Sequence, residues 1–139
     1  MSVSRIEALA DAIMHEEGWF PGSRSNRNRN PGNMRSGIGA VGTDADGYAI
    51  FRGLADGYTA LCDDLLAKCT GHTTTGLGPG STLAELIAAW APVSDGNNPS
   101  AYASAVVVWM GGALGERVTP DFKLRDIYSA AAASEVLVG

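Results

Sequence analysis

Apolar residues recur at helical spacing along most of the chain, and this pattern predicts a mainly helical fold. The first stretch predicts a helix from about residue 5 to about residue 17, because Ser4 and Glu7 form the pattern of a capping box and Gly18 is a natural stop. A second helix is expected from about Asp56 to Cys69. The remaining helices are expected to run from Thr82 until Pro92, from Asn98 until Gly111-Gly112, and from Thr119 through Tyr128.

The stretch from residue 18 to residue 47 has no helical period and is rich in glycine, asparagine and arginine, with seven of the 18 glycines, four of the six asparagines and four of the eight arginines. Residues 41–52 have the pattern of a short β-hairpin with Asp46-Gly47 at its turn. Residues 71–80 form a Thr- and Gly-rich linker, and an alanine-rich tail follows from about Ala130. The expected fold is therefore one mainly α (α+β) domain over residues 1–139, with one small β element after the first helix.

Composition fits a single packed domain. Of the 139 residues, 45% are hydrophobic and 18% are charged, which favours a buried core and argues against disorder. Fifteen acidic residues against ten basic residues give a net charge of −5, which argues against binding nucleic acid over the whole surface. No apolar run approaches the roughly 18 residues that cross a bilayer, and the N-terminus does not resemble a Sec-type leader. We therefore expect synthesis in the cytoplasm and no membrane partner.

The two cysteines predict neither a disulfide nor a metal site. Cys62 and Cys69 are seven residues apart, which in a helix separates their Cα atoms by about 10.5 Å, whereas a disulfide needs less than about 7 Å. His15 and His72 add no ligand spacing that suits zinc. We expect two reduced cysteines, no metal and no cofactor.

The first predicted helix ends in two carboxylates that are not equivalent. At about 100° per residue, Glu17 falls about 20° from Ile6, in the middle of the apolar stripe, whereas Glu16 falls about 80° to one side. Desolvation and the negative end of the helix dipole both raise the pKa of a carboxyl group at such a position. A protonated Glu17 could act as a general acid. The alternative is a structural carboxylate that caps the end of the helix.

The residues that follow Glu17 resemble a known family. The run from Glu17 to Ser25, EGWFPGSRS, resembles the start of the lysozyme-like peptidoglycan-cleaving domains. In their soluble lytic transglycosylase branch, a helix ends in the catalytic Glu, and a small residue, an aromatic, a proline and a serine come next. Residues 28–35, NRNPGNMR, look like the corresponding segment of phage and prophage members. Weaker similarity at residues 89–92 and 97–102 extends the resemblance over about residues 5–110, although the common Gly-Leu-Met-Gln-like run of the wider family is absent.

The resemblance implies roles for particular residues. Glu17 would protonate the glycosidic oxygen between N-acetylmuramic acid and N-acetylglucosamine and then act as the base. Tyr102 would lie close to Glu17 and help to orient it. The aromatic candidates for stacking on sugar faces, with core packing as the alternative, are Trp19, Tyr48 and Trp90. The expected polar contacts with the sugar or its acetamido group are Ser25, Asn30 and Asn33, with backbone groups from Asn30 to Met34 lining the cleft.

The number of carboxylates bears on the type of reaction. A hydrolytic glycosidase normally needs a second carboxylate about 5 to 9.5 Å from the acid, and the chain has no Asp or Glu between Glu17 and Asp44. Asp44 in the predicted hairpin is the candidate second carboxylate, whereas turn chemistry alone explains Asp46. A single acid fits a lytic transglycosylase, in which the acetamido and hydroxyl groups of the substrate assist, better than an inverting lysozyme. A hydrolytic muramidase is the alternative.

Four of the ten basic residues lie within twelve positions, interleaved with asparagines: Arg24, Arg27, Arg29 and Arg35. This cluster predicts a polyanion site, which either a glycan strand with lactyl-peptide carboxylates or a nucleic acid could occupy. The alternative is that the arginines hold an irregular loop in place by bonding its carbonyl groups and nearby acids. Arg27 and Arg29 are the candidate substrate contacts.

The sequence therefore predicts a monomeric, lysozyme-like enzyme that cleaves peptidoglycan glycan strands, with no nucleic acid as its expected partner. A phage or prophage lysin released by a holin, or an enzyme delivered with a virion or secretion machine, would reach the cell wall in the periplasm without a leader of its own. Two alternatives come from other classes of protein. One is a catalytically silent glycan-binding or virion structural domain, and the other is a small nucleic-acid-binding protein that uses the arginine loop.

Overall fold

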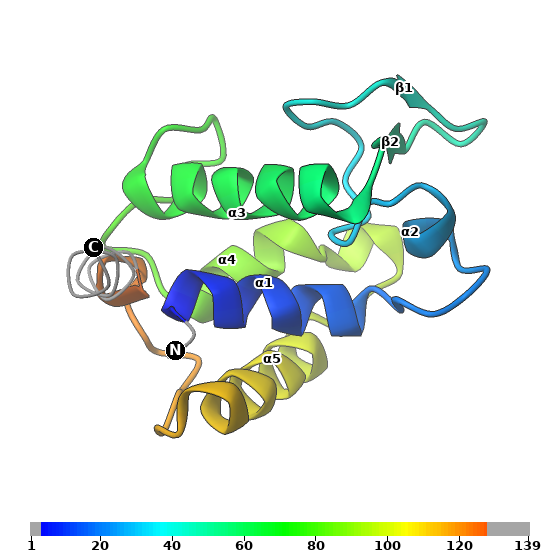
Figure 1. Ribbon diagram of the computed structural model, residues 1–139. Helices are drawn as coiled ribbons and strands as arrows, with labels where there is room; N and C mark the ends of the chain where they lie inside the picture. The colour runs from blue at the N-terminus through cyan, green and yellow to red at the C-terminus, as the bar shows by residue number, and fades with distance from the viewer. Residues whose placement is uncertain (1–3, 128–139) are drawn as a thin grey trace, which may run out of the picture. The chain divides into compact units, whose positions relative to one another are not determined.

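The computed structural model describes residues 4–127, and these residues form a mainly helical fold with one small antiparallel sheet (Figure 1). The predicted mainly α class with a hairpin after the first helix is confirmed. A further helical turn covers residues 124–127. In chain order the elements are α1 (Arg5–Glu16), α2 (Arg24–Arg27), β1 (Gly42–Thr43), β2 (Ala49–Ile50), α3 (Leu54–Thr70), α4 (Leu83–Trp90), the 3-10 turn η1 (Val93–Asp95) and α5 (Pro99–Leu114).

The chain divides into two compact units. Unit 1 comprises Met1–Leu9 and Leu66–Gly139, and unit 2 comprises Ala10–Leu65. Helices α1 and α3 each contribute residues to both units. The sequence-based expectation of a single domain over residues 1–139 stays a prediction.

Three helix starts lie where their capping residues predict them. Ser4 Oγ accepts the backbone N–H of Glu7 at 3.2 Å, and the Glu7 carboxylate accepts the N–H of Ser4 at 3.3 Å. Thr82 and Glu85 make the same reciprocal capping box at the start of α4. Asn98 is the N-cap of α5, with a proline in the first turn.

Two helix ends differ from the prediction. Helix α1 ends at Glu16, so Glu17 is the first residue beyond it. Helix α5 does not stop at Gly111-Gly112 but continues to Leu114 and is capped by Gly115 in the left-handed conformation. Helix α2 and the turn η1 were not predicted, because each is too short to show a period.

The predicted last helix begins later than Thr119. Residues 119–123 are irregular because their carbonyl groups bond to the start of α4: the N–H of Leu83 donates to the carbonyl of Phe122 at 2.8 Å, and the N–H of Ala84 donates to that of Pro120 at 2.9 Å. These two N–H groups lie in the first turn of α4 and have no partner within the helix. Tertiary pairing therefore overrides the local helix signal. Tyr128 and the alanine-rich tail lie outside the described residues.

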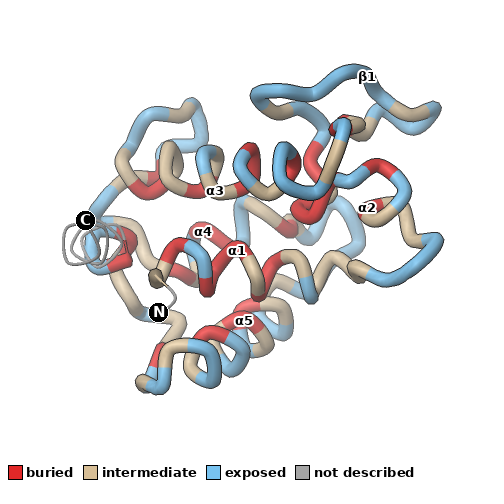
Figure 2. The backbone as a smooth tube through the Cα atoms, viewed as in Figure 1, coloured by how far each residue is buried: buried red, intermediate tan, exposed pale blue. Residues whose placement is uncertain are grey.

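The core of unit 2 is small and draws on α1, α3 and the segment between them. Buried residues lie along both helices (Figure 2). Gly57, in the first turn of α3, lets the chain approach closely, because a Cβ atom there would collide with the carbonyl oxygen of Arg29 and lie 2.9 Å from Pro31 Cδ. The larger buried apolar residues of unit 2 are Ile13, Met34, Phe51, Leu61 and Leu65.

The core of unit 1 forms where α4 packs against α5. Arg5 fixes the start of α1 within this unit through two bonds to the Glu116 carboxylate, at 2.7 and 3.0 Å. The hydrogen bond to Arg5 holds the pKa of Glu116 below its ordinary value. The larger buried apolar residues are Leu83, Leu86, Ile87, Val106, Met110, Leu124 and Ile127.

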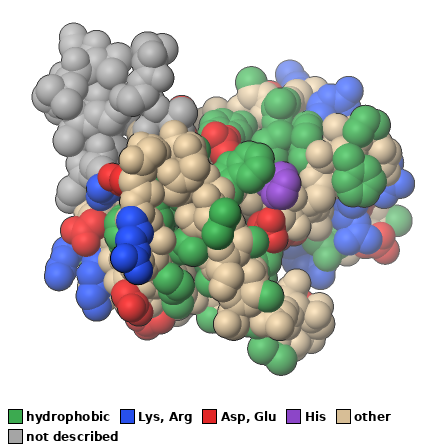
Figure 3. All heavy atoms as spheres, turned by 90° about the horizontal axis from the view of Figure 1, so that it is seen from below, with side chains coloured by type: hydrophobic (Ala, Val, Ile, Leu, Met, Phe, Trp, Pro, Cys, Tyr) green, Lys and Arg blue, Asp and Glu red, His purple; other side chains and the backbone are tan. Residues whose placement is uncertain are grey.

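Neither of the two cysteines on α3 forms a disulfide, in agreement with their spacing. Burial raises the pKa of the Cys69 thiol to about 12, which keeps it protonated and unreactive at neutral pH. Apolar side chains also reach the surface, as the space-filling view shows for one face (Figure 3). The large ones are Phe20, Ile38, Val41, Leu54, Val93, Val108 and Trp109.

Gly57→Ala should destabilise the protein by at least about 2 kcal/mol, because the new methyl group cannot share space with the Arg29 carbonyl. The matched control is Gly112→Ala in α5, where nothing lies within 4 Å of the added atom. That variant should gain about 0.5–1 kcal/mol from helix propensity. Urea unfolding of both variants measures the difference, and equal effects would show that the contact at Gly57 is unimportant.

Candidate active site

Glu17 lies on the turn that follows α1. Its N–H still donates to the carbonyl of Ile13 at 2.8 Å, as in a helix, and the next residue, Gly18, turns the chain with φ of +80°. Glu17 is half-buried, whereas His15 is exposed and its Nδ1 lies 3.1 Å from the Glu16 carboxylate. Glu16 is half-buried as well, and its carboxylate has His15 as a partner on the same helix.

Two serines hold the loop that follows Glu17. Ser23 is the N-cap of α2, and its hydroxyl also accepts the N–H of Phe20 at 3.4 Å. Ser25 is buried, and its hydroxyl donates to the carbonyl of Gly18 at 3.4 Å. Ser25 was predicted to contact the sugar, but its hydroxyl is hydrogen-bonded to the backbone of Gly18, the residue after Glu17. This arrangement favours a positioning role for Ser25.

Asn30 is fully buried and organises the next loop. Its Nδ2 donates to the carbonyls of Met34 at 2.7 Å and Ala49 at 2.9 Å, and its Oδ1 accepts the N–H of Met34 at 3.0 Å. Both donors of the amide are therefore used inside the protein, which leaves none for a sugar. The geometry favours a structural role for Asn30, with Met34 buried beneath the loop.

Asn33 differs from Asn30 because its acceptor is unused. Its backbone is left-handed, with φ of +49°, and its N–H donates to the carbonyl of Asn30 at 2.9 Å. Among residues 4–127, Asn33 Oδ1 and Arg24 Nε are the buried side-chain polar atoms without a hydrogen bond. A shielded amide oxygen without a donor is costly, so Asn33 carries the unsatisfied acceptor of this loop.

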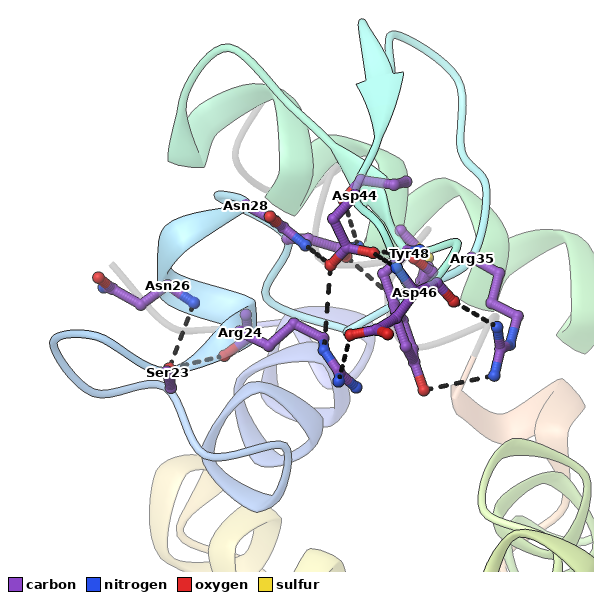
Figure 4. A network of polar contacts seen from close by, with 12 residues as sticks. Ser23, Arg24, Asn26, Asn28, Arg35, Asp44, Asp46 and Tyr48 are labelled. Carbon is purple, nitrogen blue, oxygen red and sulfur yellow. Dashed lines mark hydrogen bonds and ion pairs between the residues drawn. The ribbon is translucent and has the colours of Figure 1, made fainter.

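A stack of three side chains joins α2 to the hairpin (Figure 4). The guanidinium carbons of Arg24 and Arg35 lie 4.2 and 4.5 Å from the centre of the Tyr48 ring, on either side of it. Arg24 Nη2 also lies 3.1 Å from the Asp46 carboxylate, and Arg35 donates to the carbonyl of Asp46 at 3.3 Å. Both faces of Tyr48 are covered, so the ring has a structural role here, and the predicted stacking on a sugar has no free face.

Asp44 uses both carboxylate oxygens to build the hairpin. Its Oδ1 accepts the N–H groups of Asp46 and Tyr48, each at 2.9 Å, and its Oδ2 accepts Asn28 Nδ2 at 2.9 Å. The hydrogen bond from Asn28, followed by the one from the Tyr48 backbone, holds the pKa of Asp44 below its ordinary value of 3.8. Asp44 is thus an ionised structural carboxylate of the turn.

Arg27 and Arg29 differ from the other two arginines of the cluster. Both are exposed, and neither makes a side-chain hydrogen bond or ion pair within the part of the chain that the structure describes. The cluster therefore divides into two arginines that hold the loop, as one alternative predicted, and two that face solvent, as the other predicted.

One aromatic residue beside the candidate acid was not singled out from the sequence. Phe20 is 60% exposed, and its ring lies against Gly18, 3.3 Å from where a Cβ atom would be. Its exposure could have been predicted from the following Pro21-Gly22, which indicates a surface turn where a side chain has little to pack against. Trp19, which was singled out, is half-buried.

Tyr102 and Trp90 belong to unit 1, whereas Glu17 belongs to unit 2. Tyr102 is half-buried on α5. Trp90 is the last residue of α4, and Lys68 Nζ lies 5.3 Å from its ring centre, a cation–π contact within unit 1. The predicted contact of Tyr102 with Glu17, and that of Trp90 with a sugar, stay predictions.

Within residues 4–127, no group of three or more His, Cys, Asp or Glu side chains could hold a metal ion. None of the helices in the same residues has the length and apolar character needed to cross a membrane. Comparison with protein-family models, curated proteins and solved structures finds no match to this chain.

Asp44→Asn should lower the melting temperature at pH 7, because the lowered pKa of Asp44 means that its ionised form stabilises the folded state. This contribution is present above the ordinary value of 3.8 and is lost as the pH falls through the folded-state pKa. The gap between wild type and variant should therefore close on acidification. Asp63→Asn, an exposed acid on α3, is the control. A gap that stays constant from pH 7 to pH 2.5 would show that the carboxylate charge is irrelevant.

Proposed function

We propose that this protein is a lysozyme-like enzyme that cleaves the β-1,4 bond between N-acetylmuramic acid and N-acetylglucosamine in peptidoglycan, most closely in the manner of a lytic transglycosylase. The observation that carries the proposal is the position of the Glu17 carboxylate. It is a half-buried carboxylate on a turn that Ser25 anchors. The EGWFPGSRS and NRNPGNMR runs that resemble the family begin at this residue and continue through the rest of the loop.

The mainly helical fold with a two-stranded sheet after α1 is compatible with the proposal. Further support comes from the rigidity of the surrounding loop. Catalytic groups need support that fixes them to within a fraction of an ångström. Here Asn30 fixes the loop of residues 30–34 from inside, and the stack around Tyr48 fixes the hairpin.

In the proposed reaction the protonated form of Glu17 donates its proton to the glycosidic oxygen as the bond to C1 of the muramic acid breaks. The acetamido carbonyl oxygen of the substrate stabilises the positive charge that develops at C1. The ionised Glu17 then accepts the proton of the C6 hydroxyl, whose oxygen attacks C1. The products are a free N-acetylglucosamine end and a 1,6-anhydro muramic end, and Glu17 is protonated again.

Asn33 has the chemistry to orient the acetamido group in this scheme. Its Oδ1 is a buried acceptor without a donor among the described residues, and a movement of the loop that exposed it would let it accept the acetamido N–H of the substrate. Phe20 offers an exposed ring next to the turn of Glu17, and an apolar ring face can pack against the C–H groups of a sugar. These two residues are proposed as substrate contacts in place of Asn30 and Tyr48.

The engagement of Asp44 favours transglycosylation over hydrolysis. A base or nucleophile on the opposite side of the sugar needs a lone pair open to water or to C1. Asp44 accepts three hydrogen bonds, and its side chain is 20% exposed. Releasing it for chemistry would disrupt the hairpin turn. The hydrolytic muramidase is therefore the second candidate, and it requires that rearrangement.

Glu17→Gln should lower cell-wall clearing by about 100-fold or more, since an amide cannot donate the proton and general acid catalysis contributes that much. Glu16→Gln, the matched control at the last residue of α1, should keep nearly full activity. Melting temperatures of both variants should stay close to that of the wild type. Loss of activity in Glu16→Gln with retention in Glu17→Gln would refute the assignment, and absence of activity in the wild type would favour the silent glycan-binding domain.

Mass analysis of digested wall should show fragments one water lighter than hydrolysed fragments, as the 1,6-anhydro end requires. Asp44→Asn, assayed well below its melting temperature, should give the same products, because Asp44 takes no chemical step in this scheme. Reducing ends alone, together with complete loss of activity in Asp44→Asn, would identify a hydrolytic muramidase instead.

A further inference from the structure

Arg29 lies at a point where the chain departs twice from local preference. Its φ is +51°, in the left-handed region that glycine adopts with little strain and an arginine does not. Its carbonyl packs against Gly57 of α3, where any other residue would collide with it. Glycine is itself a weak helix former. Both departures lower the stability of the folded state, and together they determine where the backbone of Arg29 lies.

The backbone on each side of Arg29 is fixed. The N–H of Arg29 donates to the carbonyl of Asn26 at 3.1 Å. The Asn28 side chain donates to the Asp44 carboxylate at 2.9 Å, and the backbone carbonyl of Asn28 accepts the N–H of Phe51 at 2.9 Å. Asn30 is buried and fully bonded. The exposed guanidinium of Arg29 therefore extends from a rigid support, which lowers the entropy lost when an arginine binds a ligand.

Along the sequence, the charge on both sides of Arg29 is of one sign, although Asp44 lies beside it in the fold through its hydrogen bond with Asn28. From Gly18 to Thr43 the chain has four arginines and no acidic residue. Arg24 and Arg35 are already engaged by the hairpin acids and Tyr48, which leaves Arg27 and Arg29 as exposed guanidinium groups two residues apart. Arg29 directly follows Asn28, the C-cap of α2, where the left-handed conformation is common although glycine is the usual residue.

We propose that Arg29, together with Arg27, is an anion-binding site that recognises the carboxylates of peptide-substituted glycan strands. The inference rests on the proposed function for its ligand, and it adds that the protein distinguishes peptide-bearing strands from bare ones. A guanidinium binds a carboxylate through two parallel N–H···O bonds, a geometry that a lysine cannot reproduce. Two exposed arginines on a chain of net charge −5 suit a short local anion better than a long polyanion.

The test compares three uncleaved probes that bind the Glu17→Gln protein: peptide-bearing glycan strands, the same strands after removal of the peptides, and uncharged chitin oligomers. Arg29→Gly should weaken binding of the peptide-bearing strands about tenfold or more, since hydrogen bonds to charged groups contribute that much. It should weaken binding of the peptide-free strands less and leave binding of the chitin oligomers unchanged. Its melting temperature should be equal to or higher than that of the parent, because glycine relieves the left-handed strain.

Two variants complete the test. Arg29→Asn, which tolerates the left-handed backbone without the charge, should behave as Arg29→Gly does. Arg52→Ala removes an exposed arginine elsewhere in unit 2 and should change binding of every probe less than twofold, because a single surface charge contributes little.

Equal loss of affinity for all three probes, or a lower melting temperature in both Arg29 variants, would mean that Arg29 is structural and would overturn the inference. Equal loss in Arg52→Ala would reduce it to a general charge effect. Tighter binding to duplex DNA than to peptide-bearing strands, lost in Arg29→Gly, would assign the site to nucleic acid instead. Because binding is measured without cleavage, failure of the wild-type protein to cut these strands would reject the proposed enzyme and leave the result on Arg29 intact.

Discussion

A single buried amide, that of Asn30, closes the loop of residues 30–34 through two hydrogen bonds to Met34 and joins it to strand β2 through a third, to Ala49. Without it, the N–H of Met34 and the carbonyl of Ala49 would lose a partner in a place that water does not reach, at a cost of about 1–3 kcal/mol for each group. The loop carries Asn33 and follows directly from Arg29, both in left-handed conformations. Such conformations persist only where the surrounding structure determines them fully, and the amide of Asn30 supplies much of that determination.

The hairpin is held in place by contacts between charged side chains. Asp44 and Asp46 neutralise Arg24, and Tyr48 lies between Arg24 and Arg35, so two like charges are held close together without a net penalty. Most of the polar groups in this part of unit 2 are therefore satisfied by one another. Among the described residues the exceptions are few: Arg24 Nε, the acceptor of Asn33 and the guanidinium groups of Arg27 and Arg29. Groups that the framework does not need are the ones left for a ligand.

Much of the fold could be predicted because its signals are local. The capping boxes at Ser4 and Thr82 and the turn at Asp46-Gly47 depend only on residues within a few positions, and each appears where the sequence predicts it. The errors arise where distant segments meet. The segment after Thr119 gives up its helical turn to bond the start of α4, and Asn30 bonds across 19 positions to Ala49. The sequence predicted Asn30 as a polar residue of the site, but it could not show that the hydrogen-bond partners of Asn30 lie inside the protein.

The contact between Arg29 and Gly57 shows why part of the candidate site is not readable from sequence. Gly57 alone indicates only a weak point in a helix, and Arg29 alone only a surface charge. In the fold, the backbone of Arg29 approaches helix α3 so closely that only glycine fits at position 57. Arg29 keeps its long side chain although its own backbone is left-handed. Local preferences normally agree with the fold, and places where two of them fail together are expected at functional sites. The end of α2 and the close approach to Gly57 account for the left-handed backbone of Arg29, whereas its exposed side chain takes no part in that packing and is available to a ligand.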